Sequence, residues 1–346
     1  MYAWARPILF RFDPSLAHQV GMAGLWPLEL FGGYPPSDID PRLQTSTMGL
    51  RFASPIGIAG GFDKNAVRAR ALQTLGFGFL ELGTITREAQ APNPAPNLFR
   101  LPDDRALINR LGFPNDGAET VVARIRKMRD ANQIHIPVGV SIGKSRSVPV
   151  DPLDGVIADY VSSLESACTV ADFVVVNVSS PNTKDLRAIQ GADLAKRLLQ
   201  ALMAKNARSL PVLIKVAPDL ANEDLDALFS VAKECGLAGI VATNTTISRD
   251  GIQTPRETIE AIGAGGMSGP PLRERAKEVV RRARNALGPS ATIIGVGGIE
   301  TGDHAFEMLQ AGANLVQLYT SFIYRGPFTA RHIARELLAA KEKSDT

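Results

Sequence analysis

Cysteine and histidine are scarce in this chain, and their scarcity argues against several kinds of site. The 346 residues include 2 cysteines, Cys168 and Cys235, and 4 scattered histidines. Each cysteine stands within a helical pattern, so we expect two reduced core thiols of a cytosolic chain, not a disulfide. The histidines lack the close spacing of metal ligands, and we therefore expect no metal site.

Long apolar runs and an excess of one charge are also missing. No run of about 18 uninterrupted apolar residues occurs, so no segment is expected to span a membrane. Arg6, Arg11 and Asp13 interrupt the apolar N-terminus, which makes a signal peptide unexpected. The formal net charge is only +3, and electrostatics therefore indicates no nucleic-acid partner. The hydrophobic content of 45% is enough for a large core.

Short apolar runs alternate with amphipathic segments from about residue 50 onward. The runs predict strands at 55–59, 79–82, 137–142, 173–177, 211–216, 239–243, 292–296 and 315–319. The amphipathic segments predict helices near 64–75, 117–130, 153–170, 191–207, 222–235, 272–287, 302–311 and 328–342. Eight such units in series predict an α/β fold, a closed (β/α)8 TIM barrel. A doubly wound open sheet fits less well, because no GxGxxG motif follows the first strand.

The stretch 173–187 is the most informative part of the sequence. A β-branched run typical of a buried parallel strand ends in Asn177, and Ser180, Asn182 and Thr183 follow within six residues. Side-chain amides and hydroxyls beside a rigid proline can bind a polar planar ligand. A polar turn that merely closes the strand explains this stretch equally well when it is taken alone.

Glycine or polar residues follow all eight predicted strands. In a barrel these strand ends share one mouth, so their side chains should converge there. Helix capping explains one such residue but not the same outcome at eight ends. The residues concerned are Gly60, Gly61, Phe62, Asp63, Lys64, Gly83, Thr84, Ser141, Asn177, Ser180, Lys215, Thr243, Asn244, Thr245, Gly297, Gly298, Tyr319 and Thr320.

Three further segments stand outside the repeating units. The insertions 85–116 and 247–269 are expected to be long loops that act as lids or binding loops over the mouth. Residues 1–45 form a separate element, in which Asp13 and Pro14 predict a helix start. Two short helices rich in apolar residues are expected there. Their pattern is equally compatible with a bilayer surface and with a cap packed on the barrel.

The residues at the mouth suit a flavin and a cyclic amide. Glycines after the seventh strand, with Tyr319 and Thr320 after the eighth, match the phosphate site of many barrels. A phosphate anchor together with Lys215 suits FMN, because a cation near the pyrimidine ring stabilises the anion formed on reduction. Lys64 could hold a carboxylate. Ser180 is the candidate base, although a serine needs a hydroxyl or water relay, which Thr183 could supply.

Six blocks in this order resemble the class 2 dihydroorotate dehydrogenase family. These enzymes are the membrane-associated, quinone-using flavoenzymes of pyrimidine biosynthesis. The blocks are GGFDK at 60–64, NRLGF at 109–113, NVSSPNT at 177–183, KVAPDL at 215–220, ATNTT at 242–246 and GVGG at 295–298. Together they extend over nearly the whole chain.

The resemblance implies a role for each matched residue. (S)-Dihydroorotate would be oxidised to orotate for UMP synthesis, with Ser180 removing the C5 proton while hydride passes from C6 to flavin N5, and with Thr183 and Phe113 shaping the proton exit. FMN would be held by Gly60, Gly61, Phe62, Asp63, Lys64, Thr84, Ser141, Asn177, Lys215, Thr243, Gly269, Gly298, Tyr319 and Thr320. Dihydroorotate would be held by Lys64, Asn109, Arg110, Leu111, Gly112, Phe113, Asn177, Asn182, Asn244 and Thr245.

The resemblance also implies a membrane quinone as electron acceptor. The cytosolic class has cysteine at the position of Ser180, so this serine indicates the quinone-using class. Residues 1–45 would then be a helical hood on the cytoplasmic face of the inner membrane, attached peripherally, and residues 46–346 the FMN-binding barrel. His18, Arg100 and Tyr319 would line the quinone tunnel. Ser141 departs from the family, which usually has asparagine there, and a serine offers fewer donors.

Two alternatives to this function differ in chemistry. One is a related flavin barrel that acts on another cyclic amide or uses a soluble acceptor. The other is a peripheral flavin-binding protein without catalysis. The hood and Ser180 count against a soluble acceptor, and the presence of Lys64, Asn177 and Ser180 counts against loss of catalysis.

Overall fold

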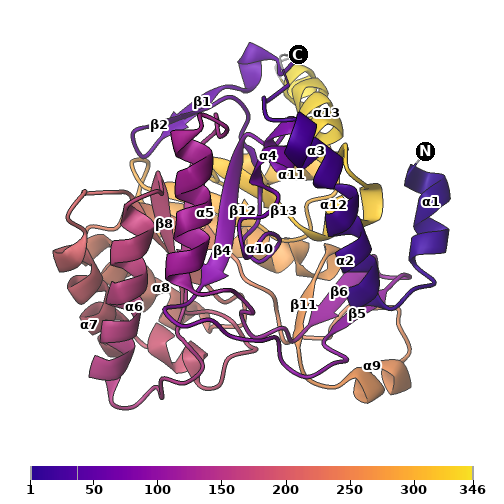
Figure 1. The fold of residues 1–346 in the computed structure, drawn as a ribbon. Coiled ribbons are helices and arrows are strands. Elements are labelled where there is room, and N and C mark those ends of the chain that lie inside the picture. The colour runs from indigo at the N-terminus through magenta and orange to yellow at the C-terminus, as the bar shows by residue number, and fades with distance from the viewer. Residues whose placement is uncertain (1, 37, 345–346) are drawn as a thin grey trace.

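Eight parallel strands close into a barrel in a computed structural model that describes residues 2–36 and 38–344 (Figure 1). Residues 1, 37, 345 and 346, which the expected ranges 1–45 and 46–346 include, lie outside the described part. The barrel strands, in neighbour order, are β3 (Ile56–Ile58), β4 (Phe79–Ile85), β7 (Val138–Ile142), β8 (Phe173–Asn177), β9 (Val212–Val216), β10 (Gly239–Ala242), β12 (Thr292–Val296) and β13 (Leu315–Leu318). The predicted barrel is confirmed.

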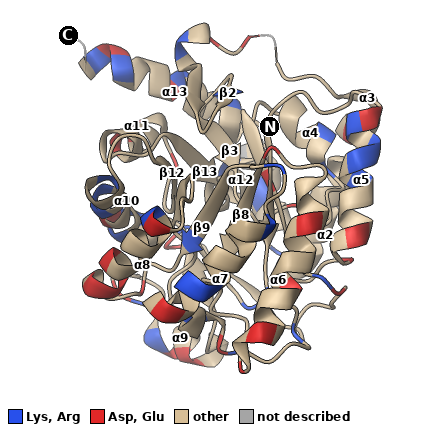
Figure 2. Cartoon of the chain, turned by 90° about the vertical axis from the view of Figure 1, so that its left-hand side faces the viewer, with Lys and Arg blue, Asp and Glu red and all other residues tan. Residues whose placement is uncertain are grey.

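Helices cover the outside of the barrel because each has one apolar face. In α5, for example, Val121, Val122, Ile125 and Met128 are buried on one side. The covering helices are α4 (Ala69–Thr74), α5 (Ala118–Asp130), α6 (Leu153–Cys168), α7 (Ala192–Lys205), α8 (Asn222–Glu234), α10 (Arg273–Leu287), α11 (Gly302–Gln310) and α13 (Thr329–Ser344). A short helix that the sequence did not predict, α12 (Thr320–Arg325), directly follows β13. Acidic and basic residues are interspersed along the outer helices (Figure 2).

The amino-terminal end of the barrel is filled by side chains. Phe79 and Phe173 occupy the interior opposite glycines, and a Cβ atom on Gly139 would lie 2.2 Å from the Phe173 ring. A hairpin of β1 (Thr45–Thr47) and β2 (Leu50–Phe52) closes this end, with the Phe52 ring 5.5 Å from that of Phe79. Since this end is solid, a ligand can enter only at the carboxyl ends of the strands.

The two insertions fold into a small sheet, and the expectation of long loops was wrong in this respect. Strands β5 (Leu98–Leu101), β6 (Ala106–Asn109) and β11 (Gly266–Ser268) pair antiparallel in the order β11-β6-β5, and α9 (Arg256–Ile262) lies in the second insertion. Leu101, Ala106, Ile108 and Met267 form its core. Strands of three or four residues give little periodic signal, and the partners of this sheet lie far apart in sequence.

Three helices, rather than the expected two, form the N-terminal element. They are α1 (Tyr2–Leu9), α2 (Pro14–Gly24) and α3 (Trp26–Phe31). Asp13 caps α2 as predicted, since its carboxylate accepts hydrogen bonds from the backbone N–H groups of Ser15 at 2.9 Å and Leu16 at 3.1 Å. Within the described residues, no helix combines the length and the apolarity needed to cross a membrane.

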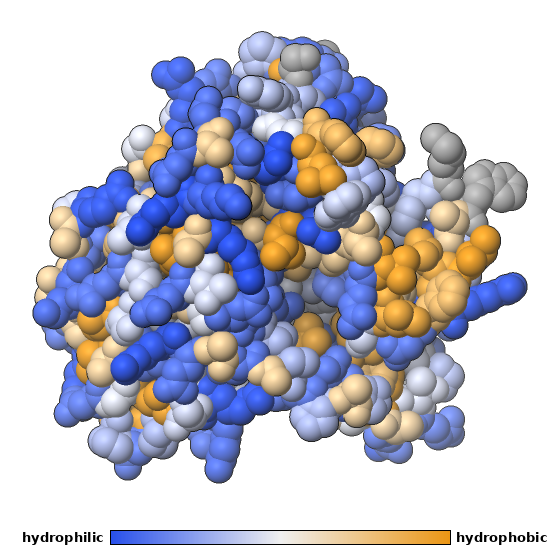
Figure 3. Space-filling view, in the orientation of Figure 1, coloured by the Kyte–Doolittle hydropathy of each residue, from blue (hydrophilic) through white to orange (hydrophobic). Residues whose placement is uncertain are grey.

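The helices of this element leave an apolar surface uncovered. Ile8, Phe12, Leu16, Val20, Trp26, Leu30 and Phe31 are all exposed, Phe31 by 86%. Figure 3 shows a hydrophobic area over the α1 and α2 region on the right of the molecule. A soluble monomer rarely exposes so many large apolar side chains on neighbouring helices.

Candidate active site

A cavity opens at the carboxyl ends of the barrel strands. It brings together residues that are spread over 260 positions of the sequence, as the barrel topology predicts. The predicted site residues that line it are Gly60, Gly61, Lys64, Thr84, Asn109, Leu111, Gly112, Phe113, Asn177, Ser180, Asn182, Lys215, Thr243, Asn244, Thr245, Gly269, Gly298, Tyr319 and Thr320.

Five predicted residues lie behind the cavity wall instead. The buried Asp63 accepts hydrogen bonds from the N–H groups of Val67 and Arg68, and Phe62 faces a second cavity. Ser141 hydrogen-bonds Thr84, with 3.0 Å between the hydroxyl oxygens. Arg110 donates to the carbonyl groups of the second insertion, and the Thr183 hydroxyl is buried. Asp63, Ser141 and Arg110 thus hold neighbouring groups through hydrogen bonds and do not line the cavity.

A buried ion pair lies beneath the cavity. The Lys215 Nζ atom is 3.3 Å from Glu81 Oε1, and these side chains are 5% and 0% exposed. The amide of Gln317 donates to the other carboxylate oxygen at 2.7 Å, while its own carbonyl oxygen has no partner. Sequence reasoning identified Lys215 but missed Glu81 and Gln317. Two polar residues inside otherwise apolar strands were the available signal.

Asparagine amides form a connected cluster on one side of the cavity. Asn177 donates to the Thr84 hydroxyl at 3.0 Å, and the side-chain amide of Asn244 donates to Asn177 Oδ1 at 3.3 Å. Asn182 donates to Asn109 at 3.1 Å, which joins the loop after β8 to the small sheet. These contacts hold each amide in a fixed orientation, so that its remaining donors and acceptors can bind a ligand.

Ser180 follows this cluster and is almost fully buried. Its Oγ atom accepts a hydrogen bond from the Asn182 N–H at 3.2 Å, and the side chain lines the cavity. The Thr183 hydroxyl, three residues later, is buried without a hydrogen-bond partner. A buried unpaired hydroxyl is costly, which makes it a candidate for contact with a ligand or a water molecule.

The opposite end of the cavity suits a phosphate group. Gly269, Gly297 and Gly298 have positive φ angles of 112°, 136° and 66°, which other residues rarely adopt. The first N–H groups of α12 have no carbonyl partner within the helix, and the buried Ser321 hydroxyl there has none in the described structure. A glycine backbone beside a helix N-terminus is the kind of surroundings that proteins use to bind phosphate groups. Sequence reasoning missed Ser321 because α12 was not predicted.

Burial perturbs two ionisable groups of the cavity. It lowers the pKa of Lys64 from 10.5 to about 8, although the neighbouring Asp63 charge acts in the opposite direction. The Lys64 ammonium donates to the Gly61 carbonyl at 2.6 Å. Burial also raises the pKa of Tyr319 from 10.0 to about 12, so this phenol stays protonated at neutral pH. The cavity therefore holds a lysine ammonium that loses its charge not far above neutral pH and a tyrosine hydroxyl that stays protonated and can donate a hydrogen bond.

A second cavity lies between the N-terminal helices and the small sheet. Of the residues predicted for a quinone tunnel, His18 and Arg100 line it, whereas Tyr319 lines the first cavity. Burial, and secondly the Lys64 charge, lower the pKa of His18 from 6.5 to about 4, so the ring is neutral. Phe62 lies between the cavities, since its ring centroid lies 5.8 Å from that of His18 and 5.7 Å from that of Tyr319.

Comparisons with known proteins agree on one family. The family model described as "Dihydroorotate dehydrogenase" matches residues 42–340. A relative from Rhodococcus opacus, named dihydroorotate dehydrogenase (quinone), is 48% identical over 97% of this chain and 94% of its own length. A relative of the same name from Gloeobacter violaceus is 44% identical over 99% and 96%.

Solved structures lead to the same result. The crystal structure of DHODH from Eimeria tenella in complex with ferulenol has a TM-score of 0.88 and 35% identity, and the match covers 96% of this chain and 93% of that one. The ligand-free form from the same organism has a TM-score of 0.85 with 35% identity, and 96% of each chain is covered. Since the family model covers most of the sequence and the relatives align over nearly their full length, the chain belongs to the dihydroorotate dehydrogenase family.

Proposed function

We propose that the protein oxidises (S)-dihydroorotate to orotate for pyrimidine (UMP) synthesis, with FMN as cofactor and a membrane quinone as acceptor. One observation carries this proposal: a single cavity combines a buried serine, an oriented amide cluster, a buried lysine and a phosphate-type end. The second cavity, with Phe62 between it and Tyr319 of the first, supports the quinone as acceptor. The relatives named above carry quinone in their names.

The residues of the first cavity fit FMN. Gly269, Gly298 and the start of α12 would hold the phosphate, where the Ser321 hydroxyl lacks a partner. Lys215 and the orphaned carbonyl oxygen of Gln317 would face the polar edge of the ring. When bound, FMN supplies the hydride acceptor and the one- and two-electron chemistry that a quinone requires.

The amide cluster and Lys64 would bind dihydroorotate. A cyclic imide edge presents donors and acceptors in one plane, and the carboxamides of Asn109, Asn177, Asn182 and Asn244 present both as well. The Lys64 ammonium would pair with the substrate carboxylate. Ser180 would take the C5 proton, with Thr183 and Phe113 on its way out. An unperturbed serine is a weak base and needs a hydroxyl or water relay. The unpaired Thr183 hydroxyl would supply that relay.

The lowered pKa of Lys64 predicts a pH dependence of substrate capture. Lys64 carries its positive charge below pH 8 and loses it above, so kcat/KM for dihydroorotate should fall about tenfold per pH unit above about 8. Lys64→Arg keeps its charge throughout this range and should lack that descending limb. Steady-state rates between pH 6 and 10 would measure both. An unchanged descending limb in Lys64→Arg would assign it to another group.

The N-terminal element is proposed as a peripheral membrane hood. Its exposed apolar side chains would lie in the lipid on the cytoplasmic face of the cell membrane, and the second cavity would admit quinone from there. His18 and Arg100 would contact the quinone. Residues 1–45 would thus form the membrane and quinone element, and residues 46–346 the catalytic barrel. Dihydroorotate and quinone would then enter from different sides.

Filling the second cavity should slow the quinone reaction alone. Gly21 is an exposed residue of α2 that lines that cavity, and no atom outside the adjoining helix backbone lies within 4 Å of its Cβ position, so a ring at Gly21→Phe meets no steric obstacle. We expect a drop of about tenfold in the rate of reoxidation by quinone, which needs only ~1.4 kcal/mol of lost binding. Flavin reduction by dihydroorotate should not change. Gln19→Phe adds the same ring at an exposed residue of α2 that does not line the cavity and is the control; equal effects of both variants would refute the tunnel.

An anaerobic titration tests the proposed function as a whole. Dihydroorotate should bleach the flavin absorbance of the purified protein, and a soluble quinone analogue should restore it. Bleaching without recovery would retain the substrate and favour a soluble acceptor. A yellow protein that dihydroorotate does not bleach would rule out the substrate while leaving the flavin assignment in place.

A further inference from the structure

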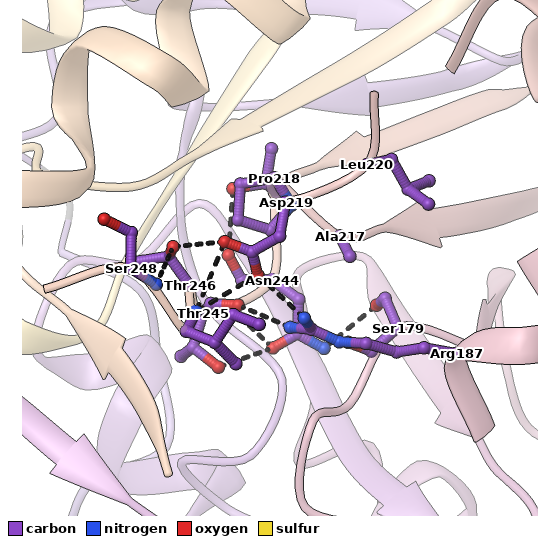
Figure 4. A network of polar contacts seen from close by, with 12 residues as sticks. Ser179, Arg187, Ala217, Pro218, Asp219, Leu220, Asn244, Thr245, Thr246 and Ser248 are labelled. Carbon is purple, nitrogen blue, oxygen red and sulfur yellow. Dashed lines mark hydrogen bonds and ion pairs between the residues drawn. The ribbon is translucent and has the colours of Figure 1, made fainter. Parts of the chain in front are cut away.

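Arg187 connects three loops at the mouth of the barrel (Figure 4). Its Nε atom donates to the Ser179 carbonyl at 3.1 Å, and its Nη2 atom donates to the Thr245 carbonyl at 3.0 Å. Its Nη1 atom pairs with Asp219 Oδ2 at 2.7 Å. These partners follow β8, β10 and β9, so one guanidinium group joins the ends of three adjacent strands.

Asp219 is held from the other side. Its Oδ1 atom accepts hydrogen bonds from the Thr246 hydroxyl and from the Ile247 N–H, the latter at 3.2 Å. The Arg187 and Asp219 side chains are only 21% and 17% exposed, so water screens the pair less than an exposed ion pair. The carboxylate thus fixes the guanidinium and the loop after β10 together.

The position of Arg187 is itself rigid. It lies on a 3-10 helix, η2 (Leu186–Gln190), in which Leu186 and Ile189 are fully buried. Gln190 accepts a hydrogen bond from the Ala217 N–H at 2.9 Å, which ties η2 to the loop after β9. The guanidinium group therefore reaches back from a fixed element to the loop 178–185, which precedes η2.

The carbonyl that Arg187 holds belongs to the peptide unit of Ser180. The Ser179 carbonyl and the Ser180 N–H share one plane, so holding that oxygen restrains the plane and leaves rotation about the Ser180 N–Cα bond as the main freedom of the Ser180 side-chain direction. Thr245, whose carbonyl is the other acceptor, lines the same cavity. We propose that Arg187, clamped by Asp219, is a positioning residue that sets Ser180 and Thr245 against the substrate. This inference rests on the proposed function for the reaction that it assists.

The guanidinium shape makes this role specific. Lysine can pair with Asp219 as a point charge, but it cannot direct three donors in one plane to three loops. Arg187→Lys should therefore retain part of the wild-type kcat with dihydroorotate, whereas Arg187→Gln and Asp219→Asn should lose most of it. Arg282→Gln is the matched control, because Arg282 makes an Arg–Asp pair of 2.6 Å with Asp226 between α8 and α10, on the outside of the barrel.

The test combines kinetics with hydrogen exchange of the flavin-loaded proteins. A misplacement of the base by about 1 Å can cost about 10²-fold in rate, so we expect kcat with dihydroorotate to fall by about 10–10²-fold in Arg187→Gln and Asp219→Asn. Flavin content and the KM for quinone should stay unchanged. Amide exchange should accelerate in 178–187 and 245–247 but not in the barrel strands. The control should behave as wild type.

Three results would overturn the inference. The first is unchanged exchange in 178–187 in both variants, the second is unchanged kcat, and the third is exchange that accelerates equally over the whole barrel, which would indicate a general loss of stability. If dihydroorotate failed to reduce the wild-type flavin, the proposed function would fall. The exchange data would then still decide whether Arg187 and Asp219 fix the loop.

Discussion

Ser180→Ala is expected to lower kcat with dihydroorotate by about 10²–10⁴-fold, the usual loss when a general acid or base is removed. The reason is geometric as well as chemical. Ser180 is buried in the cavity wall and held through the Asn182 N–H, and no histidine lines the cavity in the part of the chain that the structure describes. Rapid-reaction measurement of flavin bleaching isolates this step from quinone reduction.

Two further variants separate loss of the base from loss of the fold. Ser230→Ala removes a serine hydroxyl on α8 that donates only to the Asp226 carbonyl, and it should turn over at the wild-type rate. Ser180→Cys keeps an ionisable group at the position, so it should retain more activity than Ser180→Ala and show a different pH profile. Flavin absorbance should be the same in all of them. Equal bleaching rates in Ser180→Ala and Ser230→Ala would show that Ser180 is not the base.

Lys215→Met is expected to lower the free energy of unfolding by about 3–5 kcal/mol, because it leaves the Glu81 carboxylate buried without its cation. Glu81 has no exposed surface and would keep only the Gln317 amide as a side-chain partner. Adding Glu81→Gln to Lys215→Met removes the unpaired charge and should recover part of the loss. Urea unfolding of the flavin-free proteins measures the difference, since bound cofactor itself contributes to stability and the variant is expected to bind less of it.

The control for this pair is an exposed ion pair of similar length. Arg197 and Asp154 lie 3.0 Å apart with side chains that are 57% and 83% exposed, and Arg197→Met should cost no more than about 1 kcal/mol. Flavin content of Lys215→Met should also drop, because Lys215 lines the cavity in which we propose that the flavin binds. Similar losses in Lys215→Met and Arg197→Met would mean that the buried pair has no special importance.

Much of the barrel could be predicted because its signals are local. The strands 173–177 and 292–296 coincide with β8 and β12, since buried parallel strands are continuous apolar runs and end at the first polar residue. The helix start at Asp13 was also predicted, because a cap depends on two or three adjacent residues. The small sheet β11-β6-β5 was missed because its strands are short and come from two separate insertions.

The sequence by itself determined the barrel architecture and which residues lie at the open end of the barrel. Alternating apolar runs specify the barrel, and the barrel topology requires that Lys64, Ser180 and Lys215 meet at one end. Tertiary structure alone decided which groups pair. Glu81 with Lys215, Arg187 with Asp219, and Phe62 between the two cavities join elements far apart in the chain. Such pairs depend on distances of a few ångströms between side chains, and no local pattern of residues encodes those distances.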